Sequence, residues 1–245
     1  MKLAIFSDIH GNLPAFEAVL SDIQRQHVDQ LVCLGDIAVL GPQPVEVLHL
    51  LKQTGCPVVM GNTDHWCLDP ANYERHDEAN NLFFELERWS AMRLSDEDRQ
   101  YIHTFQPTVE LPLHGGETLL CCHGSPRNYL DQISTATPQD KLVEMLNGAS
   151  QLVVACGHTH APLLRRVGRS TIINPGSVGR PFETDPATEK VKYGKWAEYA
   201  VLEAEHGSLS AAFHRVSYDI TKLFQAARLS GMPHVEHWMS MWTSD

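Results

Sequence analysis

The sequence of 245 residues has no apolar run of the roughly 20 residues needed to cross a bilayer. It begins directly with a strand-like run, so neither a signal peptide nor membrane attachment is expected. Basic residues are scarce, since 19 Lys and Arg stand against 30 Asp and Glu, for a formal net charge of −11. General nucleic-acid binding needs a basic face, so we expect no stable nucleic-acid partner.

Cysteine is also sparse, with six residues in the whole chain. Four of them, Cys33, Cys121, Cys122 and Cys156, lie in apolar runs, where cysteine usually acts as a small buried hydrophobic residue. Together with the missing secretion signal, this pattern predicts reduced thiols in a cytoplasmic protein. Metal ligation is the alternative for Cys122, which precedes His123.

The chain contains five short apolar runs, and each is followed closely by Asp, Asn or His, the residue types that bind divalent metals. The runs are 2–7, 31–34, 57–60, 119–122 and 152–156. The residues that follow them are Asp8, His10, Asp36, Asn62, His123, His158 and His160. Ligands of open α/β sheets bind beyond the carboxyl ends of strands, so these side chains are expected to form one site.

Seven oxygen and nitrogen ligands are too many for one tetrahedral zinc site, but they suit two metal ions that share a carboxylate. Imidazole with carboxylate favours Mn, Fe, Zn or Ni over Mg or Ca. Two such ions about 4 Å apart can hold a hydroxide and clamp a phosphoryl group for in-line attack. Each motif alone is also a common turn or cap. Their recurrence at five strand ends favours the metal site.

The periodicity of the chain predicts an α/β fold. Strands at 2–7, 31–34 and 57–60 alternate with helices at 13–27 and 43–53, which indicates a sheet that is parallel at first. Residues 63–106 predict a helical insertion, with helices at about 78–92 and 95–104. The pattern then becomes antiparallel, with hairpins over 109–122, 163–173 and 197–216. Further elements are a helix near 138–147, a strand at 151–156 and helices at 219–230 and 233–241. We therefore expect one domain over 1–245, with two packed mixed sheets and helices outside.

At these motifs the sequence resembles the calcineurin-like metallophosphoesterase superfamily. The segments SDIHGNLPAFEAVL, CHGSP, GHTH and NPGSVGRP resemble a small bacterial branch of phosphodiesterases and phosphatases. The resemblance covers essentially the whole chain and implies a four-layer αββα sandwich. It implies one metal ion on Asp8, His10, Asp36 and His160. It implies a second ion on Asp36, Asn62, His123 and His158, with Asp36 bridging and a bridging hydroxide as the nucleophile.

One departure from the family pattern concerns the acid that protonates the leaving group. Many members have Gly-Asn-His-Asp or Gly-Asn-His-Glu, whereas this chain has Thr63 after Gly61-Asn62. His65, two residues on, is the candidate replacement, so the expected catalytic residues are Asp36, Asn62 and His65. Without an acid, leaving groups of low pKa are expected to be preferred.

Candidate phosphate contacts are Asn12, Arg127 and Arg180, the last after the Gly-rich segment 174–179. Arginine suits bidentate binding of phosphate oxygens, although a plain surface position is the alternative for both arginines. Candidates for stacking on a nucleobase are Trp66, Tyr73 and Tyr129, with core packing as the alternative for each.

The leading functional hypothesis is dinuclear-metal hydrolysis of a small phosphoester or nucleotide, by a phosphodiesterase or a phosphomonoesterase. Alternatives are a dinucleoside polyphosphate hydrolase and a protein phosphatase. A third is a non-catalytic scaffold, as in the retromer subunit with this fold. The presence of all seven ligands favours an enzyme. The expected cofactors are two divalent transition metal ions, with manganese first. Apolar residues near the C-terminus leave both packing on the domain and a homodimer open.

Overall fold

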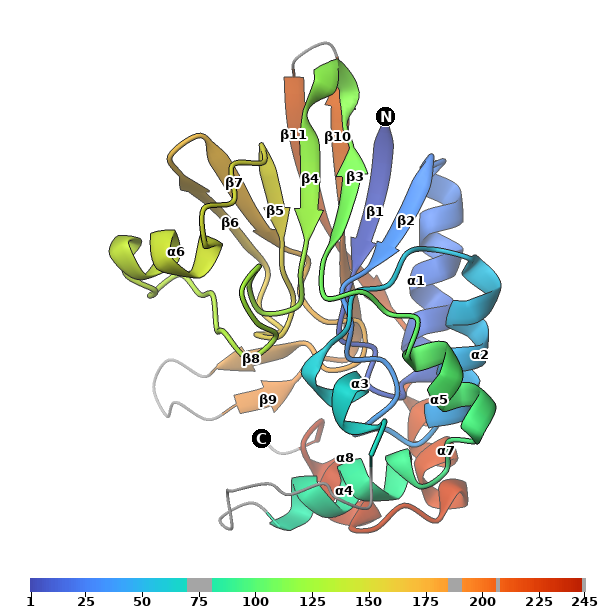
Figure 1. Cartoon of the computed structure of the whole chain (residues 1–245). Coiled ribbons are helices and arrows are strands. Elements are labelled where there is room, and N and C mark those ends of the chain that lie inside the picture. Colours follow the sequence, from blue (N-terminus) through green and yellow to red (C-terminus); the bar gives the residue numbers. More distant parts are fainter. Residues whose placement is uncertain (70–80, 185–190, 206–207, 244–245) are drawn as a thin grey trace.

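A computed structural model describes residues 1–69, 81–184, 191–205 and 208–243, and shows two β-sheets packed face to face with helices outside (Figure 1). The first sheet has the order β11 (Ser208–Ser217), β10 (Trp196–Glu205), β1 (Lys2–Phe6) and β2 (Gln30–Cys33). The second has the order β3 (Val109–Pro112), β4 (Thr118–Cys121), β5 (Val153–Ala155), β7 (Ser170–Asn174) and β6 (Leu163–Val167). Both sheets are mixed, because β1–β2 and β4–β5–β7 pair in parallel while β1–β10, β3–β4 and β6–β7 are antiparallel.

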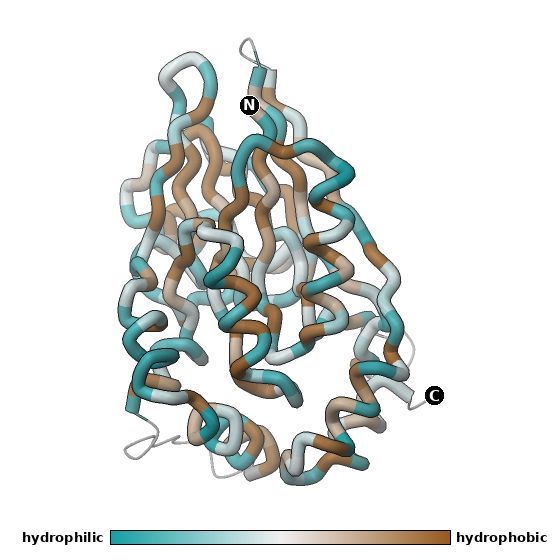
Figure 2. The backbone as a smooth tube through the Cα atoms, turned by 90° about the vertical axis from the view of Figure 1, so that its right-hand side faces the viewer, coloured by the Kyte–Doolittle hydropathy of each residue, from teal (hydrophilic) through white to brown (hydrophobic). Residues whose placement is uncertain are grey.

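The layers explain why β1 is apolar at every position instead of alternating. Leu3 and Ile5 lie in the core between the two sheets, whereas Ala4 and Phe6 lie in the core beneath the outer helices. Those helices are α1 (Leu13–Gln26) and α2 (Pro44–Thr54). On the other side, α6 (Gln139–Leu146) covers the second sheet through Leu142 and Leu146. Hydrophobic strands therefore run through the middle of the molecule, as Figure 2 shows, and the predicted four-layer sandwich is confirmed.

The segment predicted as a helical insertion contains α3 (Asn62–Trp66), α4 (Asn81–Ala91) and α5 (Asp96–Ile102). The first residues of the helix predicted at 78–92 lie outside the described residues. A reciprocal hydrogen-bonded cap between Ser95 and Asp98 begins α5, as the sequence indicated. None of the described helices is long and apolar enough to span a membrane.

The chain ends in α7 (Ile220–Ser230) and α8 (Val235–Ser240), which lie below the sheets in Figure 1. Trp238 and Trp242 are fully buried against the main core, and the Trp238 indole N–H donates to the Leu40 carbonyl. The apolar residues near the C-terminus therefore pack on the domain, which is one of the two outcomes that the sequence left open.

Three details of the topology differ from the prediction. The strand expected at 57–60 is reduced to isolated bridges of Val58 with Cys33 and of Val59 with Gln106. The second half is not purely antiparallel, because β4, β5 and β7 run parallel. A small hairpin of β8 (Phe182–Thr184) and β9 (Val191–Tyr193) was not predicted, and the turn expected at 206–207 lies outside the described residues. Periodicity identifies an extended run, but it does not specify the strand with which that run pairs.

Candidate metal centre

The predicted metal ligands meet where the parallel strands end, at the lower edge of the sheets in Figure 1. Asp8 and His10 follow β1, and Asp36 follows β2. His123 follows β4, while His158 and His160 follow β5. Asn62 is the first residue of α3. The structure thus brings all seven predicted ligands to one place, in two clusters of His and Asp side chains with Asn62 beside the second.

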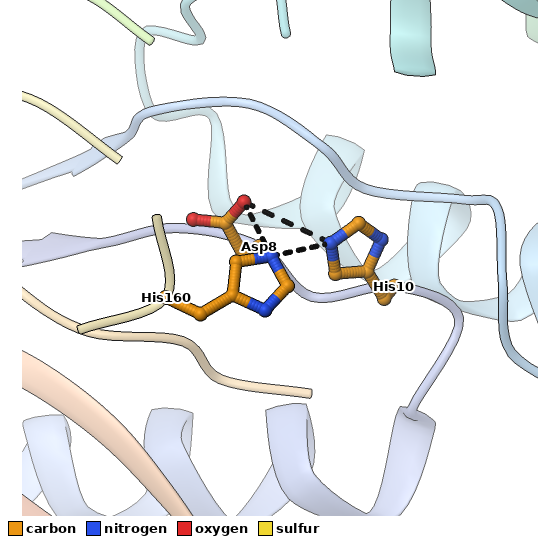
Figure 3. Close-up of side chains that lie close together, drawn as sticks. All are labelled: Asp8, His10 and His160. Atoms are coloured by element: carbon orange, nitrogen blue, oxygen red, sulfur yellow. Dashed lines mark hydrogen bonds and ion pairs between the residues drawn. The ribbon is translucent and has the colours of Figure 1, made fainter. Parts of the chain in front are cut away.

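The first cluster contains Asp8, His10 and His160 (Figure 3). The Nε2 atoms of the two histidines lie 3.0 Å apart. Asp8 Oδ1 lies 3.2 Å from His160 Nε2 and 3.7 Å from His10 Nε2. Asp8 and His10 are buried, whereas His160 is partly accessible.

Backbone carbonyls fix the hydrogen positions in this cluster. His10 Nδ1 donates to the Val39 carbonyl over 3.1 Å, and His160 Nδ1 donates to the Arg180 carbonyl over 3.1 Å. A carbonyl can only accept, so each neutral ring carries its hydrogen on Nδ1 and directs an Nε2 lone pair toward the other. Asp8 Oδ1, which is buried, adds a third acceptor without a hydrogen-bond partner among the described residues. Three converging acceptors favour a cation between them.

The second cluster contains Asp36, His123 and His158, with Asn62 beside it. His123 Nδ1 donates to the Leu34 carbonyl over 2.7 Å, so its Nε2 faces the site and would offer a lone pair to a cation once the ring has lost its second proton. That Nε2 lies 3.2 Å from Asn62 Oδ1 and 3.5 Å from Asp36 Oδ1. The second cluster therefore repeats the residue types of the first, with imidazoles beside a carboxylate, and adds an amide oxygen.

Asp36 connects the two clusters. Its Oδ1 faces His123, while its Oδ2 lies 3.9 Å from His10 Nε2 in the first cluster. Oδ1 also accepts a hydrogen bond of 2.9 Å from the Thr63 backbone N–H. One carboxylate thus presents an oxygen to each cluster, which is the arrangement of a ligand shared by two ions.

The electrostatics favour positive charge around Asp36. Burial opposes its ionisation, yet His123 and His10 outweigh burial and lower the pKa of Asp36. Burial and the neighbouring His160 lower the pKa of His10 to about 3, so this ring is neutral and can act as a ligand. Burial alone would lower the pKa of His123, but Asp36 and Asp8 raise it to about 10. The donor set and the orphaned Asp8 oxygen fit divalent ions with nitrogen and oxygen ligands.

The backbone at the site is unusual, because five of the seven candidate ligands have positive φ angles. They are Asp8 (57°), His10 (47°), Asp36 (58°), His158 (67°) and His160 (56°). Such angles are uncommon outside glycine, and non-glycine residues in sparsely populated regions cost of order 1–3 kcal/mol each. Gly61 lets these loops approach closely, since a Cβ there would lie 2.2 Å from Asp36 Oδ1.

Asp64 holds two ligand-bearing loops together. This buried carboxylate accepts backbone hydrogen bonds from Asp36 (2.7 Å), Ile37 (2.9 Å) and Gly61 (3.1 Å). Burial and the charge of Asp36 raise the pKa of Asp64 to about 7, while the three N–H donors favour its ionised form. Sequence reasoning missed this role, although Asp64 stands in the quoted Gly-Asn-Thr-Asp motif.

The three predicted phosphate contacts have different surroundings. Asn12 is buried, caps α1 by accepting from the Ala15 N–H, and donates to the Gly179 carbonyl. Arg127 is exposed and forms ion pairs with Asp131 and Glu144. Substrate contact by either residue stays a prediction.

Arg180 lies closer to the metal ligands. It is buried, its carbonyl holds His160, and its positive charge contributes to the lowered pKa of His10. Its guanidinium lies over the Tyr193 ring at 4.7 Å and the Phe83 ring at 5.3 Å. These rings come from β9 and α4, and no local sequence signal indicated either one.

His65 and Thr63 lie on α3 in different environments. Thr63 is buried, whereas His65 is exposed, with its Nδ1 3.4 Å from the Tyr129 hydroxyl. The predicted role of His65 as an acid stays a prediction. Trp66 is half-buried, and Tyr73 lies outside the described residues.

Comparison with known proteins agrees with this fold and site. Residues 1–194 match the model of the calcineurin-like phosphoesterase superfamily domain, so the chain belongs to that family. It is therefore a metal-dependent hydrolase that acts on phosphoester bonds.

Two relatives and one crystal structure are similar to this chain over most of its length. Phosphodiesterase YfcE of Escherichia coli is 29% identical over 203 residues, which cover 77% of this chain and 85% of that protein. An uncharacterised protein of Methanocaldococcus jannaschii is 26% identical to this chain, and the match covers 94% of this chain and 93% of that protein. The crystal structure of a metallophosphoesterase from Sphaerobacter thermophilus matches with 29% sequence identity and a TM-score of 0.74. The match covers 98% of this chain and 99% of that one.

Proposed function

We propose that this phosphoesterase uses two divalent transition metal ions to hydrolyse small phosphoesters, either phosphodiesters or phosphomonoesters. One ion would be held by Asp8, His10, Asp36 and His160, and the other by Asp36, Asn62, His123 and His158. The observation that carries the proposal is the position of Asp36, whose two carboxylate oxygens face the two clusters. When bound, the ions would supply Lewis acidity and a hydroxide nucleophile near neutral pH.

The residues of the chain hold this site in advance of substrate. Carbonyls of Leu34, Val39 and Arg180 fix the orientation of three imidazoles, and Asp64 fixes the Asp36 loop. Such preorganisation means that little rearrangement is needed when charge develops during the reaction. The Arg180 guanidinium adds positive charge beside the first cluster, which supports a role in attracting phosphate oxygens.

The ligand set supports a choice among metals. Four histidines with two aspartates and one asparagine favour Mn, Fe, Zn or Ni over Mg or Ca. We expect Mn²⁺ to support the reaction best. Activity restored only by Mg²⁺ or Ca²⁺ would contradict this assignment.

The test is hydrolysis of bis(p-nitrophenyl) phosphate and p-nitrophenyl phosphate by chelator-treated protein, with and without added Mn²⁺. The parent protein should hydrolyse at least one ester, and only with metal. Asp36→Asn keeps the shape of the side chain but removes the shared charge, so turnover should fall at least about 10²-fold. Asp96→Asn, an exposed position in the first turn of α5, is the matched control and should match the parent. An Asp36→Asn variant as active as the parent would exclude the bridging role.

A further inference from the structure

Two segments that carry candidate metal ligands touch each other twice, once in the interior and once at the surface. In the interior, Asn62 Oδ1 lies 3.2 Å from His123 Nε2. At the surface, His65 Nδ1 lies 3.4 Å from the Tyr129 hydroxyl, and the ring centroids are 5.5 Å apart. His65 follows Asn62 by one turn of α3, and Tyr129 follows His123 by six residues. The ring pair therefore joins the same two segments as the second cluster, with His65 exposed to solvent.

The turn that carries Tyr129 is held in place by its own polar groups. Ser125 Oγ donates to Asp131 Oδ2 over 2.6 Å, and the Ser125 N–H donates to the Asn128 carbonyl over 2.8 Å. Asn128 Oδ1 accepts from the N–H groups of Leu130 and Asp131, both over 2.8 Å. Gly124 lets this turn pack closely, because a Cβ there would lie 2.8 Å from the Tyr129 backbone. The Tyr129 ring is thus positioned before any ligand binds.

We propose that His65 and Tyr129 form a subsite for a planar aromatic group of the substrate, either a nucleobase or an aryl ring. This inference rests on the proposed function, because it places the subsite beside the phosphoester site. His65 is exposed and Tyr129 is half-buried, so part of each ring remains open to a stacking partner. Stacking tolerates any base, because every base has a π face.

The charges around this subsite favour an aromatic group over a second phosphate. Arg127 is the cation nearest to Tyr129 in the sequence. Its guanidinium is engaged by Asp131 and by Glu144 of α6, two carboxylates that offset its single positive charge. The Tyr129 hydroxyl faces His65 Nδ1, and neither side chain is a lysine or an arginine. The subsite therefore offers ring surface and not an anion site.

The experiment compares two diesters that share the p-nitrophenyl leaving group: p-nitrophenyl thymidine 5′-phosphate and p-nitrophenyl methyl phosphate. The variants are Tyr129→Leu, which removes the ring, and Tyr129→Phe, which keeps the ring without its hydroxyl. Stacking on a base contributes enough to change binding by about 5- to 150-fold. If the nucleobase occupies the subsite, Tyr129→Leu raises KM by that factor for the thymidine ester alone. If the aryl ring occupies it, KM rises for both esters. Tyr129→Phe should stay within about twofold of the parent in either case.

Equilibrium binding of thymidine 5′-monophosphate to the metal-loaded protein provides a readout without turnover, with inorganic phosphate as the reference ligand. If the base stacks, Tyr129→Leu weakens binding of the nucleotide but not of phosphate. Unchanged KM for both esters together with unchanged nucleotide binding would overturn the subsite. Equal losses in Tyr129→Leu and Tyr129→Phe would overturn it as well. A parent protein that hydrolyses no ester would instead contradict the proposed function, and nucleotide binding would still test the subsite.

Discussion

At the scale of single residues, the site combines strain with unsatisfied acceptors. Asp8, His10, Asp36, His158 and His160 all adopt positive φ angles, and in the first cluster Asp8 Oδ1 has no hydrogen-bond partner among the described residues. Arrangements of this kind persist where the surrounding structure enforces them. Here the carbonyls of Leu34, Val39 and Arg180 enforce them by holding three imidazoles. Cation binding to these residues would offset the free energy that the strained backbone angles and the unpaired acceptor cost.

Thr63 makes a residue-scale prediction about leaving groups. It stands where the family pattern has a histidine, it is buried, and its backbone N–H donates to Asp36. A threonine hydroxyl cannot act as an acid near neutral pH, so the leaving group must depart without that help. General acid catalysis contributes about 10²–10⁴-fold, and alkyl esters should be slower than aryl esters by a factor in this range.

The measurement is kcat/KM for a series of phosphoesters whose leaving groups differ only in pKa. The expected result is a steep fall as the pKa of the leaving group rises. His65→Gln, measured on the same series, tests whether His65 supplies the proton. A flat dependence in the parent that becomes steep in His65→Gln would show that this histidine is the acid.

At the scale of elements, helix α3 is the part that organises the second half of the site. Its first residue, Asn62, faces His123, and its third residue, Asp64, holds the loop that carries Asp36. A helix of five residues has little stability of its own, so tertiary contacts such as these must hold it.

Asp64→Asn tests this anchoring role. Asparagine can replace one accepting oxygen, but its NH₂ group would face backbone N–H groups, which leaves buried donors unpaired at a cost of about 1–3 kcal/mol. We expect a lower Tm and a loss of metal-dependent turnover together. The measurements are thermal unfolding and kcat/KM with saturating Mn²⁺.

Asp98→Asn is the matched control, because Asp98 occupies the same third position in α5 and accepts from the Ser95 N–H and hydroxyl. It should lower Tm with little change in turnover. Equal turnover losses in the two variants would mean that Asp64 acts on stability alone.

The sequence predicted best those features that depend on neighbouring residues in the chain. The ends of β1, β2, β4 and β5, the convergence of the seven candidate ligands and the start of α5 at Ser95 could all be predicted from residue types and spacing. The contacts of the Arg180 guanidinium with the Phe83 and Tyr193 rings could not, because the three residues come from distant segments and follow no motif. The carbonyls that fix the histidines could not be predicted either, since backbone atoms give no sequence signal. The strand pairing of residues 57–60 depended on packing with β2 and not on their own composition.

At the scale of the whole molecule, the sandwich brings distant parts of the chain to one edge. His10 and His160 lie 150 residues apart in the sequence, yet their Nε2 atoms are 3.0 Å apart. Strands buried on both faces provide the rigidity that such a site needs, because the loops start from fixed positions. The chain carries a net charge of −11, and cations bound at this edge would strengthen the local attraction for an anionic phosphoester.

The central claim is that two metal ions occupy this edge, and metal titration of the chelator-stripped protein tests it most directly. Calorimetry with Mn²⁺ should give two ions per chain, and hydrolysis should appear only as they bind. At a free Mn²⁺ concentration about 100-fold above Kd, binding of one ion stabilises the fold by about 2.7 kcal/mol. For a chain of this size, that corresponds to a rise in Tm of about 5–10 °C. Full hydrolysis by the stripped protein, or saturation at a single ion with full activity, would contradict the account.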